Sequence, residues 1–335
     1  MEWTNYKAVA LIDWLMLRIE FQAPTQRQWV QKELRRLLSL PEDAPEIWVK
    51  AIKRKAGGAA CSFWVKLHDT PANDMALLES TMAGLDGWRP MAHTSVAALE
   101  VSIDFLWGDL DHNGTRARDA ARALQTGFAS YGKNPRQYDP ETGKTPFLAH
   151  KTGLIDQCTL YVGNHRGRRR DPICARIYNK VTDHNQKPIP ASEHRARVEI
   201  TLQRGAPARL GITDITSLKA FPFESLKEHV HFRRIKEDLS AGSKLQKDAQ
   251  EQTKAGNTER ARFLSNLAKL TGKTLKEHGG EHAVSWPFGW VRQNPGHGPQ
   301  PRRTHSRHTE PDKPLNTKIE RALKKLLQQK QNGND

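Results

Sequence analysis

Three short segments in the middle of this chain alternate apolar and polar residues, and this alternation limits the possible folds most strongly. They are "CTLYVGN" at 158–164, "PICARIYNK" at 172–180 and "ARVEITLQR" at 196–204. A period of two residues is typical of β-strands, because successive side chains point to opposite faces of a sheet. Strands that follow one another closely along the chain favour antiparallel pairing, so these segments predict one antiparallel sheet.

Strand and helix signals alternate over the first two-thirds of the chain. Further strands are predicted at "WLMLRIEF", "CSFWVKLH" and "VAALEVSIDFLW". Helices are predicted at "PTQRQWVQKELRRLLSL", after a threonine cap, and at the basic, amphipathic "GTRARDAARALQTGFASYG". The fold class is therefore α+β, an antiparallel sheet with flanking helices, and we place this domain at residues 1–212.

The last third of the chain has a different pattern. Residues 213–290 predict a helical region, with helices at 221–240 and 258–278. Residues 291–335 predict a basic linker, rich in Pro, Gly, Arg and His, followed by a terminal helix. One face of that helix carries its apolar residues, which are Leu315, Ile319, Leu323, Leu326 and Leu327.

The charge of the chain points to a polyanionic partner. The formal net charge is +16 and the sequence pI is about 9.8, which favours nucleic acid. No apolar run approaches the ~18–20 residues of a membrane-spanning helix, and the N-terminus lacks the pattern of a signal peptide. Cys61, Cys158 and Cys174 have no zinc-site spacing, so we expect reduced thiols and a cytoplasmic protein.

The strands at 99–105, 173–180 and 197–203 each have an apolar face and a polar face. If these strands are neighbours in the sheet, their polar faces form one surface that carries Glu100, Asp104, Arg176, Tyr178, Lys180, Arg197 and Glu199. Two or three carboxylates on such a surface can hold one Mg²⁺ or Mn²⁺, which prefer oxygen ligands.

The same surface offers a nucleophile and cations. The Tyr178 hydroxyl can attack phosphorus once a cation stabilises its phenolate. Arg176 and Lys180 can clamp the phosphate and stabilise developing charge. Another reading stays open, because a polar face that meets water is ordinary in antiparallel sheets. In that reading Arg197 and Glu199 form only a cross-strand ion pair.

These segments also resemble a known family. "TLYVGN", a basic loop, "ARIYNK" and "ARVEITLQR" follow one another in the order of a T-L-Y-x-G strand, an R-x-Y-x-K strand and an R-x-E strand. This order of motifs resembles that in the replication initiation factors of rolling-circle plasmids and filamentous phages. "EVSIDF" and "IDWLMLRIEF" resemble upstream strands of that family. The loop before the Tyr178 strand is longer and richer in arginine than the family pattern.

The resemblance implies a relaxase-like domain that nicks one DNA strand at its origin with a metal ion. The implied roles are nucleophile for Tyr178, metal ligands for Asp104 and Glu199, and phosphate partners for Arg176 and Lys180. Glu100 has no firm counterpart in the family pattern, and we add it as a metal ligand because it shares the polar face.

These observations predict a rolling-circle replication initiator that forms a 5′-phosphotyrosine link with the help of Mg²⁺ or Mn²⁺. Its expected partner is origin DNA, double-stranded at the origin and single-stranded at the nick. No membrane partner is expected. A host helicase, a polymerase and a second copy of the chain are further candidate partners. The alternatives are a conjugative relaxase, with the same chemistry, and a non-enzymatic origin-binding replication protein.

Clusters of arginine predict where DNA binds. The candidate residues are Arg166, Arg168, Arg169 and Arg170 in "HRGRRR", Arg116, Arg118 and Arg122 in the helix at 115–128, and Arg197 on the sheet. A solvated charged face is the alternative for the helix.

Two rival groups of residues compete for the chemistry. His229 and His231 have the spacing of a two-histidine metal motif, but the predicted helix at 221–240 would point them about 160° apart. The rival nucleophiles are Tyr6, Tyr131, Tyr138 and Tyr161.

Overall fold

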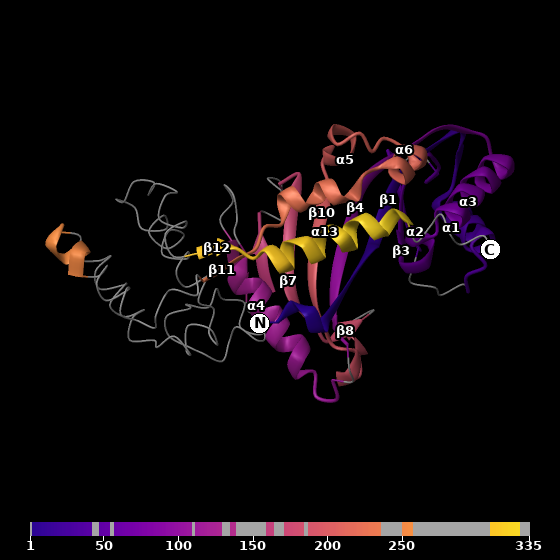
Figure 1. The fold of residues 1–335 in the computed structure, drawn as a ribbon. Coiled ribbons are helices and arrows are strands. Elements are labelled where there is room, and N and C mark those ends of the chain that lie inside the picture. Colours follow the sequence, from indigo (N-terminus) through magenta and orange to yellow (C-terminus); the bar gives the residue numbers. More distant parts are fainter. Residues whose placement is uncertain are drawn as a thin grey trace.

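A computed structural model describes the strand-rich part of the chain and its last helix. The described residues are 2–41, 47–53, 57–108, 111–128, 135–138, 159–163, 171–183, 187–235, 250–256 and 309–328. Over these residues the predicted α+β class is confirmed, since an antiparallel sheet is flanked by helices (Figure 1). The helix predicted at 258–278, most of the linker and the arginines of "HRGRRR" lie outside the described residues.

Eight described strands form the main sheet, and all their pairings are antiparallel. Their order is β2-β3-β1-β4-β10-β7-β6-β5, so β10 lies between β4 and β7. The strands are β1 (Tyr6–Thr25), β2 (Ile47–Ile52), β3 (Ala60–His68), β4 (Met91–Trp107), β5 (Pro135–Tyr138), β6 (Thr159–Val162), β7 (Ile173–Lys180) and β10 (Arg195–Leu202). Two smaller pairs are β8 (Thr182–Asp183) with β9 (Lys187–Pro188), and β11 (Arg233–Ile235) with β12 (Thr309–Pro311).

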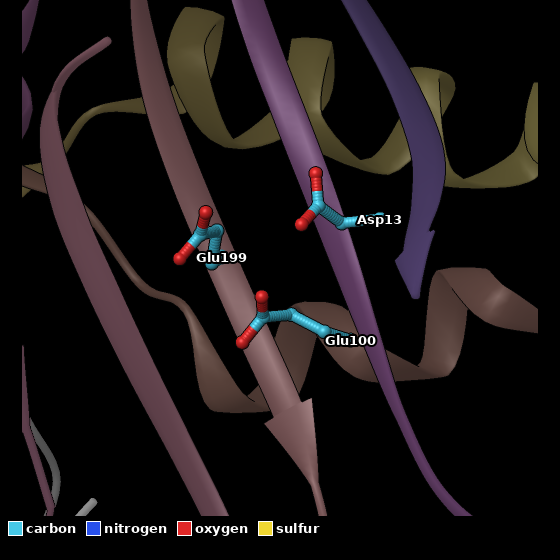
Figure 2. A group of neighbouring side chains, drawn as sticks. All are labelled: Asp13, Glu100 and Glu199. Carbon is cyan, nitrogen blue, oxygen red and sulfur yellow. The ribbon is translucent and has the colours of Figure 1, made fainter. Parts of the chain in front are cut away.

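Helices cover the apolar face of this sheet. Helix α4 packs against β7 and β10, α13 against β1, and α1 against β2, and Figure 2 shows helices passing behind the strands. The helices are η1 (Trp3–Asn5), α1 (Arg27–Leu37), α2 (Asp69–Asn73), α3 (Met75–Trp88), α4 (Thr115–Gly127), η4 (Ala191–Glu193), α5 (Ala206–Arg209), α6 (Ile215–Ala220), η5 (Phe223–His229) and α13 (Lys313–Gln328).

The hydrophobic core fixes the register of the central strands. Val101 and Ile103 on β4, with Val198 and Ile200 on β10, are fully buried. Burying one such side chain contributes ~1.5–3 kcal/mol. A slip of one residue would turn the charged residues into the core, so this register is strongly specified.

A β-bulge in β1 changes which residues of that strand face the core. Ile12 pairs with Val101 and Trp14 pairs with Glu100, so Asp13 is the extra residue. The Asn73 side chain holds the bulge, because it accepts a 2.8 Å hydrogen bond from the Ile12 amide and donates a 2.6 Å bond to the Ile12 carbonyl. The buried apolar residues of β1 are Tyr6, Ala10 and Ile12 before the bulge, and Leu15, Leu17, Ile19 and Phe21 after it.

The last helix belongs to the core of the sheet domain. Its predicted apolar face is buried through Leu315, Ile319 and Leu323, and the helix lies across β1 (Figure 1). Trp3 Nε1 donates a buried 3.0 Å hydrogen bond to Asp312 Oδ2, so the N-terminal segment contacts the residue that precedes α13. The helix that we predicted at the end of a basic tail therefore shares the core of the N-terminal strands.

The prediction of a helix over 221–240 is wrong for residues 230–235, and residues 236–240 lie outside the described residues. The chain forms the 3₁₀ helix η5 and then an extended segment, in which Phe232 bridges to Phe128 before β11. Val230 and Phe232 are both buried. Their spacing of two residues fits an extended backbone and overrides the helical pattern.

Candidate metal and tyrosine site

The register places the predicted polar residues side by side. Across β10, Arg197 lies between Asp104 and Tyr178. Two residues further along β10, Glu199 lies opposite Arg176. The three strands are neighbours in the sheet, which was the condition for one shared polar surface. Their polar side chains share the face away from the helices.

Three carboxylates on this face come together from three strands. Asp13 on β1, Glu100 on β4 and Glu199 on β10 each offer one oxygen, and these oxygens lie within 4.8 Å of one another. Figure 2 shows the three groups gathered in front of the sheet. Oxygens bound to one Mg²⁺ at ~2.0–2.1 Å are up to about 4 Å apart. Small side-chain rotations would therefore let the three hold one ion.

Asp13 is the member of this group that the sequence prediction missed. The bulge turns both Asp13 and Trp14 onto the polar face, whereas regular alternation would place only one of them there. The signal for it is the change of phase in the apolar residues of the strand, from Ile12 to Leu15. Bulges often re-aim a side chain next to a functional site.

Asp104 does not join the three carboxylates. Arg197 donates to both of its oxygens, from Nε to Oδ1 at 2.6 Å and from Nη2 to Oδ2 at 2.7 Å. Arg195 Nε donates to Oδ2 at 2.9 Å. The structure thus places Asp104 in a buried ion-pair cluster, because its cross-strand neighbour is an arginine.

Glu199 links the tyrosine to the carboxylates. Its side chain is 1% exposed, and Tyr178 Oη donates a 2.6 Å hydrogen bond to its Oε1. Arg176 Nη2 lies 2.5 Å from Oε2 as an ion pair, but Oε2 accepts no aligned hydrogen bond among the described residues. Burial and the negative charge of Glu100 raise the pKa of Glu199 to about 7.

Glu100 is held in place by three donors. Its Oε1 accepts hydrogen bonds from Trp14 Nε1 at 2.9 Å and from Arg176 Nη2 at 3.1 Å. Its Oε2 accepts one from Thr201 Oγ1 at 2.5 Å. Arg176 therefore bridges Glu100 and Glu199, and its guanidinium is the cation between them.

An ion-pair network joins the charged groups of this face. Arg197 Nη1 extends it to Asp13 Oδ1 at 2.7 Å. The members are the carboxylates of Asp13, Glu100, Asp104 and Glu199, and the guanidinium groups of Arg176, Arg195 and Arg197. Lys66 adds a fourth cation, because its ammonium group interacts with Glu100 and Asp13. Asp13, Glu100 and Glu199 supply oxygen ligands of the kind that Mg²⁺ and Mn²⁺ prefer.

Tyr178 is the tyrosine that the structure places beside the carboxylates. Burial, together with the Glu199 carboxylate, raises the pKa of its phenol well above the usual value. A phenolate at this position therefore needs an added positive charge. Its hydrogen bond to Glu199 also gives the proton a direct acceptor.

The rival residues differ in their positions. Tyr6 is buried and donates to the Arg116 carbonyl at 2.9 Å, and burial raises its pKa to about 12. Tyr161 lies opposite Arg176 on β6, on the same polar face as the site, and Tyr138 ends β5. Tyr131 lies outside the described residues. The residues that flank Val230, His229 and His231, do not take part in the carboxylate group.

The predicted phosphate and DNA contacts are distributed unevenly. Lys180 pairs with Asp183 at 2.9 Å. Arg197 is 2% exposed and contacts carboxylates, so its side chain is in the interior and not on a DNA-facing surface. Among the other candidates, Arg116 and Arg118 are exposed and Arg122 is half-buried on α4, the helix that packs on the apolar face. Arg166, Arg168, Arg169 and Arg170 lie outside the described residues.

Comparisons with known proteins found no match, so any assignment of function rests on the geometry described above. No family model matches the chain, and no curated protein matches it either. Among the helices that the structure describes, none is both long enough and apolar enough to cross a membrane.

Proposed function

We propose that this chain is a rolling-circle replication initiator, a metal-dependent relaxase-type enzyme that nicks one DNA strand through Tyr178. The observation that carries the proposal is the 2.6 Å hydrogen bond from Tyr178 Oη to Glu199. Glu199 in turn belongs to the three carboxylates that can hold a divalent ion. A nucleophile, a proton acceptor and a metal site thus share one face of the sheet.

The proposed step is a transesterification at phosphorus. Tyr178 Oη attacks the scissile phosphate, and the bond from phosphorus to the 3′ oxygen breaks. The products are a 5′-phosphotyrosine and a free 3′-hydroxyl. Glu199, which already accepts a hydrogen bond from Tyr178 Oη, takes the phenolic proton, and the departing 3′ oxygen takes a proton from water.

The carboxylates Asp13, Glu100 and Glu199 would hold Mg²⁺ or Mn²⁺. When bound, the ion supplies Lewis-acid polarisation of the phosphate and favours the phenolate. Arg176 is one-third exposed, so its guanidinium can turn from the carboxylates toward a phosphate oxygen and stabilise developing charge. Lys180 stands two residues beyond Tyr178 on β7 and can contact the neighbouring phosphate.

The proposal extends to the partners and the setting. The substrate is origin DNA, unpaired at the nick, and the protein acts in the cytoplasm. The positive charge of the chain, +16 in total, supports binding to a polyanion. A host helicase would unwind the duplex, and a host polymerase would extend the free 3′ end.

The test is covalent capture of DNA by the full chain. The purified protein is incubated with Mn²⁺ and a pool of random single-stranded oligonucleotides, and adducts that survive denaturation are separated on a gel. We expect adducts for wild type and for Tyr161→Phe, which removes a hydroxyl on the neighbouring strand. Tyr178→Phe keeps the ring and should give none.

Two results would contradict the proposal. Adducts that persist in Tyr178→Phe would assign the nucleophile elsewhere. Tight binding of DNA by wild type with no adduct under any metal condition would favour the non-enzymatic origin-binding protein. A conjugative relaxase shares the chemistry and would differ in the DNA sequence that is recovered from the adducts.

A further inference from the structure

An open groove of about 780 Å³ crosses the polar face of the sheet beside the carboxylates. Its lining runs from Trp64 on β3 to Tyr161 on β6, and every strand between them contributes residues. These six strands have five intervals of ~4.8 Å, which correspond to roughly 24 Å. An elongated groove of this length suits a chain molecule better than a compact metabolite.

The lining combines aromatic rings with cations. Trp64 and Tyr161 are half-buried, so part of each ring faces the groove. Lys66 Nζ lies 4.3 Å from the centroid of the Trp14 ring, which holds this ammonium group in the groove. Arg204 is exposed at the rim. The proposed cleavage step uses none of these side chains.

We propose that this groove binds unpaired DNA, with bases stacked on the aromatic rings and phosphates beside the cations. Proteins that bind single strands combine these two features, because every base offers a flat face for stacking. The net charge of +16 favours a polyanion over a neutral peptide or glycan.

The groove is continuous with the tyrosine site. Glu100 and Arg176 belong to its lining and also to the network around Glu199. A strand in the groove would therefore place its next phosphate near Tyr178. The inference rests on the proposed function, and it names the subsite for the nucleotides adjacent to the cleaved bond.

The test is equilibrium binding of a fluorescein-labelled oligo(dT) to the full chain, measured by fluorescence anisotropy. The buffer contains EDTA so that no cleavage occurs. Trp64→Ala should weaken binding by roughly 5- to 150-fold, the usual range for loss of one stacked base. Trp64→Phe keeps a ring and should restore most of the affinity. The matched control is Trp29→Ala, because Trp29 is 50% exposed on α1, on the opposite side of the sheet.

The outcomes separate this inference from the proposed function. Equal affinities of Trp64→Ala and Trp29→Ala for oligo(dT) would refute the binding of DNA in the groove, even if Tyr178 forms adducts. An equal loss for duplex DNA of the same length would also contradict base stacking. If the binding of oligo(dT) depends on Trp64 but no adduct ever forms, DNA binding in the groove is supported and the proposed nicking activity is refuted.

Discussion

Glu199→Gln should remove a large pH dependence from the stability of the metal-free protein. The pKa of Glu199 rises from 4.5 in the unfolded chain to about 7 in the fold, so the native state holds the proton more tightly. Each unit is worth about 1.36 kcal/mol, and the shift therefore corresponds to about 3 kcal/mol. That is a large part of a typical free energy of unfolding of ~5–15 kcal/mol.

The sign follows from which state binds the proton. Below pH 4.5 both states are protonated at Glu199 and the stabilisation is complete. It is lost as the pH rises through about 7, because the native state must then carry a buried, poorly compensated charge. The difference in free energy of unfolding, wild type minus Glu199→Gln, should fall by about 3 kcal/mol between pH 4.5 and 7.

The assay is urea unfolding of both proteins in EDTA at closely spaced pH values. Subtracting the two curves cancels the titrating groups that do not interact with Glu199. Mn²⁺ added at pH 8, at a concentration a hundred times its Kd, should raise the free energy of unfolding of the wild type by about 2.7 kcal/mol. The effect on the variant should be smaller. Parallel curves for the two proteins would refute both the raised pKa and the burial of the Glu199 carboxylate on which it depends.

Two further variants test the remaining parts of the account. Asp13→Asn should weaken Mn²⁺ binding, measured by electron paramagnetic resonance, by at least about tenfold, whereas Asp183→Asn should leave it unchanged; equal affinities would remove Asp13 from the site. Leu323→Ala, at a fully buried position of α13, should cost ~2–5 kcal/mol in urea unfolding. The neighbouring exposed Lys324→Ala should cost almost nothing, and a similar loss for both would mean that α13 does not belong to the core.

The sequence predicted much of the polar face because strict alternation assigns each side chain to one side of a strand. Glu100, Arg176, Tyr178 and Glu199 were placed on one surface from this pattern alone. The insertion of β10 between β4 and β7 was an assumption at that stage. Only the pairing of strands distant along the chain could establish it.

Two features of the site depend on contacts that no local pattern specifies. Asp104 and Glu100 lie on the same face of β4, but Asp104 meets Arg197 across the strands and Glu100 meets Thr201. That difference explains why Asp104, and not Glu100, is held by ion pairs with Arg195 and Arg197. Asp13 reaches the site only through the bulge, which Asn73 holds from 61 residues away.

The position of α13 was also beyond local prediction. Its amphipathic pattern was clear, but an apolar face does not name the surface that covers it. The buried bond from Trp3 to Asp312 joins residues 309 positions apart. Such long-range contacts follow from the assembled sheet rather than from the helix itself.

The most direct measurement of the central claim is the site of DNA attachment, determined by mass spectrometry of the trypsin-digested adduct. Trypsin cuts after Arg176 and Lys180, and it releases a four-residue peptide, Ile177–Lys180, in which Tyr178 is the only tyrosine. We expect a phosphodeoxynucleotide on this peptide, formed with Mn²⁺ and absent with EDTA. An adduct on a peptide that carries Tyr138 or Tyr161, or an adduct that forms equally well in EDTA, would contradict it.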